Sequence, residues 1–109
     1  MEERLKRIYC PMSETGFYIL FCLQEEMHGY NITKKVKEMT NNEILLPPGT
    51  MYGSLSKMEN DGLIQFIREE DKRKLYKITN LGKEILEIEI KRIERLYKNS
   101  KGENYDQRI

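Results

Sequence analysis

The stretch PGTMYGSLSKMENDGLI, residues 48–64, is the segment from which the rest of the chain can be interpreted. On a helical wheel with about 100° per residue, its large apolar side chains gather on one side; they are Met51, Leu55 and Met58. This spacing predicts a helix over residues 50–61, and Gly62 is expected to end it as a left-handed cap. The opposite side is small and polar and contains Gly53, although a glycine inside a helix costs about 1 kcal/mol relative to alanine. The glycine therefore argues against the interpretation that this face of the helix is only exposed to solvent.

Two helices are expected before this segment. Ser13 can cap a helix over residues 14–25, because its side-chain oxygen can accept a hydrogen bond from a free backbone N–H. The apolar residues of this helix have mixed three- and four-residue spacing; they are Phe17, Leu20, Phe21 and Leu23. MHG interrupts the pattern, and a second helix follows over residues 30–39. The first twelve residues are expected to be a charged lead-in, and TNNEILLPP is a connection whose prolines keep its end extended.

The segments after residue 62 alternate between apolar and polar residues and then change to helical spacing. LIQFIRE, residues 63–69, and LYKIT, residues 75–79, predict two strands that pair as a hairpin around the polar turn EEDKRK. Thr79 or Asn80 can cap a long helix that continues to about Asn99. The predicted fold is mostly α with a small β-hairpin, namely a winged helix-turn-helix with a long C-terminal helix. We expect the winged domain over residues 1–79, a dimerisation helix over residues 80–99 and a flexible tail over residues 100–109.

Composition limits the classes of protein that remain. The 109 residues include 39% hydrophobic and 34% charged residues, which is typical of one globular domain. No apolar run approaches the roughly 18 residues of a membrane span, and no signal-peptide core follows MEERLKRIYC, so we expect a cytoplasmic protein without a membrane partner. The isolated Cys10 and Cys22 and the single His28 predict no metal site, and no cofactor is expected. No phosphate-binding glycine loop and no catalytic Ser–His–acid arrangement can be placed, so an enzyme is not expected.

Three segments together carry a resemblance to a known family. They are FYILFCLQEEMHGYNI (residues 17–32), PPGTMYGSLSKMENDGLI (residues 47–64) and DKRKLYKITNLGKEIL (residues 71–86). In this order they resemble the PadR family of bacterial transcriptional regulators, over about residues 12–98. The resemblance implies a homodimeric winged-helix protein that binds double-stranded operator DNA, usually as a repressor relieved by a small ligand or a similar signal. The chain departs little from the pattern: Met51 stands where Leu or Ile is common, and the short region after the wing resembles the smaller members.

A DNA-binding surface is expected on the polar side of the 50–61 helix and at the tip of the hairpin. Hydroxyl groups suit base edges, small residues allow close approach, and basic residues can contact phosphates or guanine. The backbone near Tyr30, at the start of the second helix, can offer free N–H groups to a phosphate. The predicted DNA-contacting residues are Tyr30, Thr50, Tyr52, Gly53, Ser56, Lys57, Lys72, Arg73 and Lys74. The alternatives are a solvated helix face, a solvated turn and, for Tyr30, a packed core tyrosine.

The long C-terminal helix has two apolar stripes, whereas a helix on a monomer needs one. Spacings of four, three and four residues form an a/d seam, made of Leu86, Ile90, Ile93 and Tyr97. A second stripe of Leu81, Ile85 and Ile88 is offset from it. We expect the second stripe to pack on its own domain and the seam to pack on a partner copy. The alternative is one broad face against a single core.

An effector site is a further expectation. A small apolar or aromatic effector can be accommodated at the dimer interface by Phe17, Phe21, Ile93 and Tyr97. For Phe17 and Phe21 the alternative, that they are simply core residues, is the favoured one. The predicted function is that of a sequence-specific, double-stranded DNA-binding transcriptional regulator, acting as a homodimeric repressor. The alternative is a winged-helix module that binds proteins and not DNA. The net charge of only +1 and the acidic flank of the wing, residues 69–71, keep that alternative open.

Overall fold

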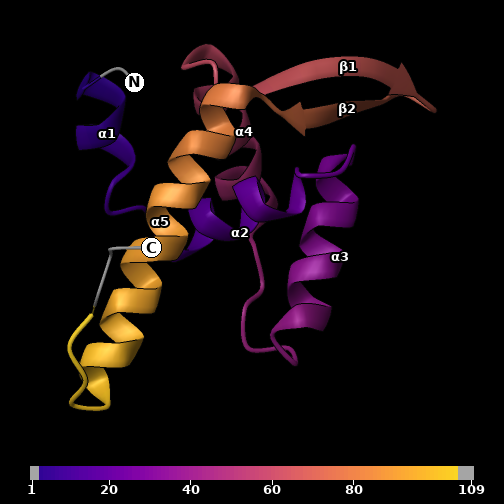
Figure 1. The fold of residues 1–109 in the computed structure, drawn as a ribbon. Coiled ribbons are helices and arrows are strands. Elements are labelled where there is room, and N and C mark those ends of the chain that lie inside the picture. Colours follow the sequence, from indigo (N-terminus) through magenta and orange to yellow (C-terminus); the bar gives the residue numbers. More distant parts are fainter. Residues whose placement is uncertain (1–2, 106–109) are drawn as a thin grey trace.

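The computed structural model describes residues 3–105. Over these residues five helices and one antiparallel hairpin follow one another (Figure 1). They are α1 (Glu3–Tyr9), α2 (Glu14–Cys22), α3 (Gly29–Met39), α4 (Pro48–Asn60), β1 (Ile64–Glu70), β2 (Arg73–Ile78) and α5 (Asn80–Ser100). The expected class is confirmed: a mostly helical winged helix-turn-helix with a long C-terminal helix. Within the expected tail, residues 101–105 lie beyond α5, and residues 106–109 lie outside the described part.

The charged lead-in is more ordered than the sequence analysis expected, because it forms helix α1. Leu5 and Tyr9 are one helical turn apart and both are buried in the core. Their burial favours the helix over an extended segment, since most of the stability of a short helix comes from packing of its apolar face. α1 thereby becomes part of the domain.

Local capping signals set the helix boundaries. The Ser13 hydroxyl accepts a hydrogen bond from the Gly16 N–H at 3.0 Å, and the Thr79 hydroxyl accepts one from the Gly82 N–H at 3.1 Å. Gly62 has a φ of 83°, so the left-handed end expected after α4 is confirmed. α2 ends at Cys22, earlier than predicted, and residues 23–25 continue as turns.

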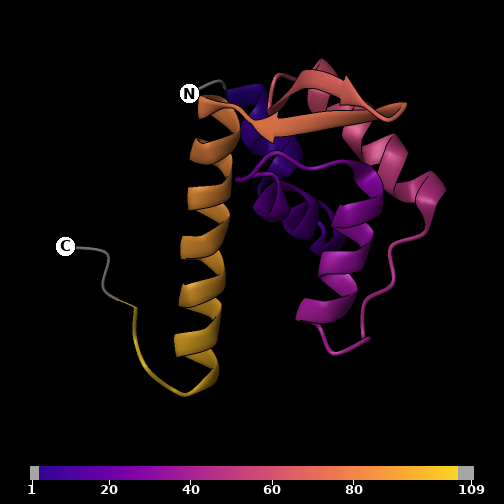
Figure 2. The same cartoon turned by 90° about the vertical axis from the view of Figure 1, so that its right-hand side faces the viewer.

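The core lies between α2, α3, α4, the base of the hairpin and the first half of α5 (Figure 2). In this view α5 stands along one side of the molecule and α4 lies on the other. The apolar stripe predicted for α4 is buried, with Met51, Leu55 and Met58 all facing the core. The polar side of α4 therefore faces away from α5. None of the helices among residues 3–105 is long and apolar enough to cross a membrane.

The hairpin forms the wing and has a tight tip. β1 and β2 pair from Ile64 opposite Ile78 to Glu70 opposite Arg73, and Asp71 and Lys72 turn the chain with positive φ values of 49° and 65°. Two backbone hydrogen bonds of 3.1 Å between Met27 and Tyr76 attach the wing to the loop before α3. The strands therefore extend further than predicted, and the polar turn shrinks to two residues.

Candidate nucleic-acid interface

A cleft of about 360 Å³ opens between the wing, the start of α3 and one flank of α4. Six of the nine predicted DNA-contacting residues line it: Tyr30, Tyr52, Ser56, Lys72, Arg73 and Lys74. They come from segments that are far apart in the sequence and that the fold brings to one surface. The remaining lining residues are His28, Gly29, Leu55, Glu69 and Tyr76.

Close packing of α3 on α4 places the aromatic residues of the cleft. A Cβ atom on Gly29 would lie 2.7 Å from Met51 Cε and 2.9 Å from Tyr52 Cε1, so any larger residue here would require these two side chains to shift. Tyr30 is 60% exposed, and the Arg73 guanidinium lies 5.2 Å from the centroid of its ring. Tyr30 is therefore not a packed core tyrosine. Its contact with Arg73 links the wing to α3.

The exposed face of α4 has space beside its glycine. Thr50, Gly53 and Ser56 are all exposed, and a Cβ atom on Gly53 would meet no atom within 4 Å. Nothing in the described part of the chain therefore requires a glycine at this position. Since glycine also weakens the helix, an external surface that approaches α4 closely is the simplest physical reason for it.

Lys57 occupies a different place from the other predicted contacts. Its ammonium lies 3.1 Å from Asp61 Oδ2 and 5.3 Å from the centroid of the Tyr9 ring, on the side of α4 that faces α1. The Tyr9 hydroxyl donates to the same carboxylate oxygen at 2.7 Å. Lys57 is thus engaged with its own domain, and it does not line the cleft.

The Tyr9–Asp61 hydrogen bond was not anticipated from the sequence. The hydrogen bond from Tyr9 is the largest influence that lowers the pKa of Asp61, and Lys57 adds to the effect against the opposing influence of burial. Burial first, and then Asp61, raise the pKa of the Tyr9 hydroxyl. The four-residue spacing from Lys57 to Asp61 suits an ion pair on a helix and could have indicated that part of the cluster. Nothing in the sequence places Tyr9 beside them.

The acidic flank of the wing is partly neutralised. Arg68 Nε lies 2.8 Å from Glu70 Oε1, and one of its terminal nitrogens lies 2.6 Å from Glu26 Oε1. Glu70 and then Glu26 raise the pKa of the Arg68 guanidinium. Within residues 3–105 the wing-tip cations Lys72–Lys74 form no ion pair, and Glu69 is the acidic residue that remains in the cleft.

The second half of α5 exposes an apolar strip. Ile90, Ile93 and Tyr97 are 38%, 40% and 63% exposed, and Leu96, which the sequence analysis did not select, is also exposed. Leu86 differs, because only 3% of its surface is exposed. The prediction that Leu86 packs on a partner is therefore wrong: α5 is still against its own core at this turn, so the exposed strip begins one turn later.

A separate cavity of about 420 Å³ lies between the start of α2 and α5, lined by Met12, Ser13, Glu14, Phe17, Tyr18, Arg92 and Ile93. It brings together Phe17 and Ile93 from the expected effector site. Phe21 and Tyr97 do not line it; the Phe21 ring stacks on Phe17 with centroids 6.0 Å apart and packs against the core. The buried Glu89 carboxylate fixes one wall, since it accepts hydrogen bonds from Arg92 Nε at 2.8 Å and from the Met12 N–H.

The fold and this surface define a winged-helix transcription regulator. The model of the PadR-like family of transcriptional regulators matches residues 19–88, which is more than half of the chain. The chain therefore belongs to the PadR-like family.

Solved structures show the same arrangement. A PadR family transcription regulator from Clostridium difficile is 32% identical, with a TM-score of 0.67 over 81% of this chain and 97% of that one. Bacillus subtilis PadR in complex with operator DNA is 28% identical, with a TM-score of 0.59 over 66% of this chain and 44% of that one. A transcriptional regulator from Clostridium thermocellum, 22% identical, shares the fold over 94% of this chain and 96% of that one, with a TM-score of 0.72.

Two curated relatives are longer than the matched region. The chain spans 62% of the length of an uncharacterised protein from Lysinibacillus sphaericus, at 31% identity, and 20% of the length of a transposon protein from Streptomyces fradiae, at 30% identity.

Proposed function

We propose that the protein is a sequence-specific regulator that binds double-stranded operator DNA as a homodimer and represses transcription. The observation that supports this most is the cleft between the wing and α4, in which residues from three separate segments bring hydroxyl groups to one surface together with cations that form no ion pair within residues 3–105. Bacillus subtilis PadR, which this chain resembles in fold, forms a complex with operator DNA.

In this proposal α4 enters the major groove with its polar face. Gly53 allows the backbone of the helix to approach the DNA closely, and Thr50 and Ser56 present hydroxyl groups to base edges. The wing-tip cations Lys72–Lys74 contact phosphates or the minor groove beside it. Tyr30 and Tyr52 direct their hydroxyl groups toward phosphates from the cleft.

Dimerisation is proposed through the exposed strip of α5, formed by Ile90, Ile93, Leu96 and Tyr97. A strip of large apolar side chains on a solvated helix favours a second apolar surface as its partner. Two copies place two recognition helices on one DNA molecule, and half-sites spaced by about one helical turn, roughly 34 Å, suit such a dimer. Each half-site alone is weak because the chain has a net charge of only +1, and the pair gains from binding both at once.

Relief of repression is proposed through the cavity between α2 and α5. Phe17, Tyr18 and Ile93 give it an apolar side, and Arg92 is the cation in its wall. A small apolar or aromatic molecule fits this lining. Because the cavity lies against the dimerisation helix, its occupant can alter the distance between the two recognition helices.

A gel-shift titration with the DNA upstream of the protein's own gene tests the proposal. The wild-type protein should retard this fragment at about 50 mM salt, and retardation should fall steeply toward about 200 mM, because binding releases counterions from the phosphates. An unrelated duplex of equal length should compete poorly. A folded, dimeric sample that retards neither duplex at low salt would overturn the proposed function.

A further inference from the structure

The exposed face of α3 carries a second concave surface, of which the DNA contacts described above use Tyr30 alone. It encloses about 450 Å³ and is lined by Tyr30, Thr33, Lys34, Lys37, Glu38 and Asn42. Tyr30 also lines the cleft under the wing. The two concave surfaces therefore meet at this residue.

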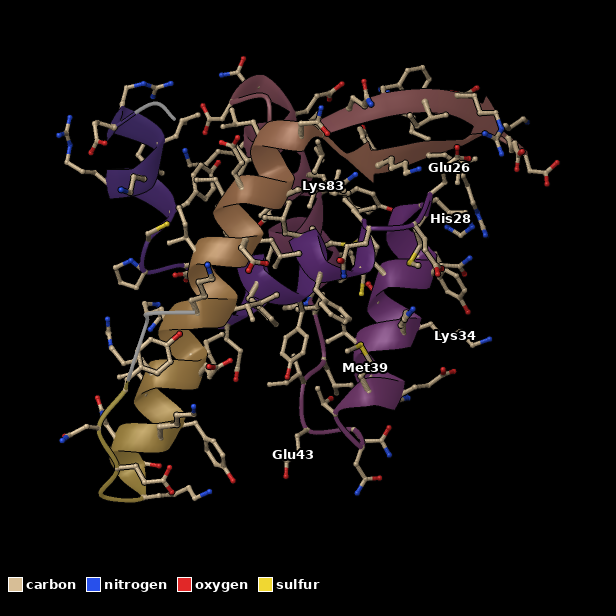
Figure 3. The ribbon with its side chains drawn as sticks, in the orientation of Figure 1. Glu26, His28, Lys34, Met39, Glu43 and Lys83 are labelled. Carbon is tan, nitrogen blue, oxygen red and sulfur yellow. The ribbon has the colours of Figure 1, made fainter. Side chains whose placement is uncertain are left out.

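Three of these residues form a row along the helix. Tyr30, Lys34 and Lys37 are separated by four and three residues, so they lie on the same face of α3. All three are exposed. The row spans about 10 Å at about 1.5 Å per residue. Figure 3 shows the Lys34 side chain extending away from the helix on the side of the molecule toward which the wing projects.

The row continues the charge of the wing. Among residues 3–105 neither Lys34 nor Lys37 forms an ion pair, and the same holds for the wing-tip cations Lys72–Lys74. Arg73 covers the Tyr30 ring and thus places one cation where the two surfaces meet. Two carboxylates face the combined surface, Glu38 on α3 and Glu69 on the wing. The basic side chains outnumber them by five to two, so the surface favours an anion along its whole length.

We propose that Lys34 and Lys37 bind phosphates of the DNA strand that leaves the cleft, so that α3 extends the contact beyond the wing. This inference rests on the proposed DNA-binding function. One strand of duplex DNA presents a phosphate about every 3.4 Å along the helix axis, so a row of about 10 Å matches about three nucleotides. Contacts to phosphates carry no base information. The row should therefore raise the affinity for every sequence and lengthen the protected site.

The test uses the double variant Lys34→Gln/Lys37→Gln, in which glutamine keeps the helix propensity and removes the charge. Lys83→Gln is the matched control, since Lys83 is an exposed lysine of α5, away from the α3 face, and has no ion pair in the described part of the chain. The dissociation constant for the upstream fragment is measured against salt concentration. Each lost phosphate contact should flatten the slope of the logarithmic plot by about 0.9. The double variant should lose up to about 1.8 per protomer, and the control should match the wild type.

A second measurement shortens the DNA. Removing the outermost base pairs of the site should weaken binding by the wild type and by Lys83→Gln, but it should have no further effect on the double variant. If the double variant keeps the wild-type slope and the same response to shortening, the α3 contact is overturned while the proposed function stands. If the wild type binds no DNA at low salt, the proposed function fails and the α3 contact fails with it.

Discussion

Substitution of Gly53 should separate the stability of the helix from its binding to DNA. A Cβ atom at this position meets no atom within 4 Å, so Gly53→Ala adds a methyl group without a clash inside the described structure. The change should stabilise α4 by about 1 kcal/mol, the usual difference between alanine and glycine in a helix interior. For a domain of this size that corresponds to a rise in Tm on the order of 5 °C.

The same substitution should weaken DNA binding. If α4 approaches the groove with the face that carries Gly53, even a methyl group pushes the helix away from the base edges. A leucine is longer, so Gly53→Leu should abolish specific binding while the fold remains intact. The contrast is Gly29→Ala, whose methyl group would lie 2.7 Å from Met51 Cε and 2.9 Å from Tyr52 Cε1. Both side chains would have to shift, so this variant should not show the rise in Tm expected for Gly53→Ala.

Circular-dichroism melting and fluorescence-anisotropy titration with the upstream DNA measure both effects on the same samples. The expected pattern for Gly53→Ala is a higher Tm together with a higher dissociation constant. Wild-type affinity in Gly53→Leu would refute the assignment of this face to DNA. A lower Tm in Gly53→Ala would refute the packing argument instead.

Three further predictions use the same fold. Lys72→Ala should weaken binding to all sequences and flatten the salt slope by about one unit per protomer, whereas Thr50→Ala should change affinity for particular base pairs only; anisotropy with a panel of mutated sites distinguishes the two. Because the pKa of Asp61 is lowered in the folded protein, its stabilising contribution is present above the ordinary aspartate pKa of about 3.9 and is lost as the pH falls through the folded value. In urea unfolding, the difference in free energy of unfolding between wild type and Asp61→Asn should therefore be larger at neutral pH than below pH 4. An equal difference at both pH values would contradict this. If the exposed strip of α5 forms the proposed dimer, Ile93→Glu should sediment as a folded monomer where the wild type sediments as a dimer, and a folded dimer of Ile93→Glu would place the interface elsewhere. Leu86→Ala should instead lower the free energy of unfolding by about 2–5 kcal/mol, because Leu86 is buried in its own core.

Elements with local signals could be predicted from the sequence. Ser13, Gly62 and Thr79 act through groups within three or four residues of themselves, and they set helix ends where the capping patterns indicated. The alternation of the wing strands likewise depends on residues that are adjacent in the chain. The buried stripe of α4 follows from helical periodicity alone.

The misjudged features depend on distant partners. α1 packs through Leu5 and Tyr9, and Tyr9 bonds to Asp61, 52 residues away. The place of Lys57 beside Tyr9 and Asp61, outside the cleft, likewise becomes visible only once α1 is placed; its predicted contact with DNA stays a prediction. The predicted seam on α5 begins one turn too early, at Leu86, which is buried in the core of its own domain. Heptad spacing alone does not show at which residue a helix extends beyond its own core.

Hydroxyl-radical footprinting of the upstream DNA tests most directly whether the polar face of α4 and the wing form a DNA-binding surface. With the wild-type protein we expect two protected patches about one helical turn apart, each with a matching patch on the opposite strand. Gly53→Leu should remove both patches although the protein remains folded. Protection that persists unchanged in Gly53→Leu, or no protection by a folded wild-type dimer at low salt, would contradict the proposed role of this surface.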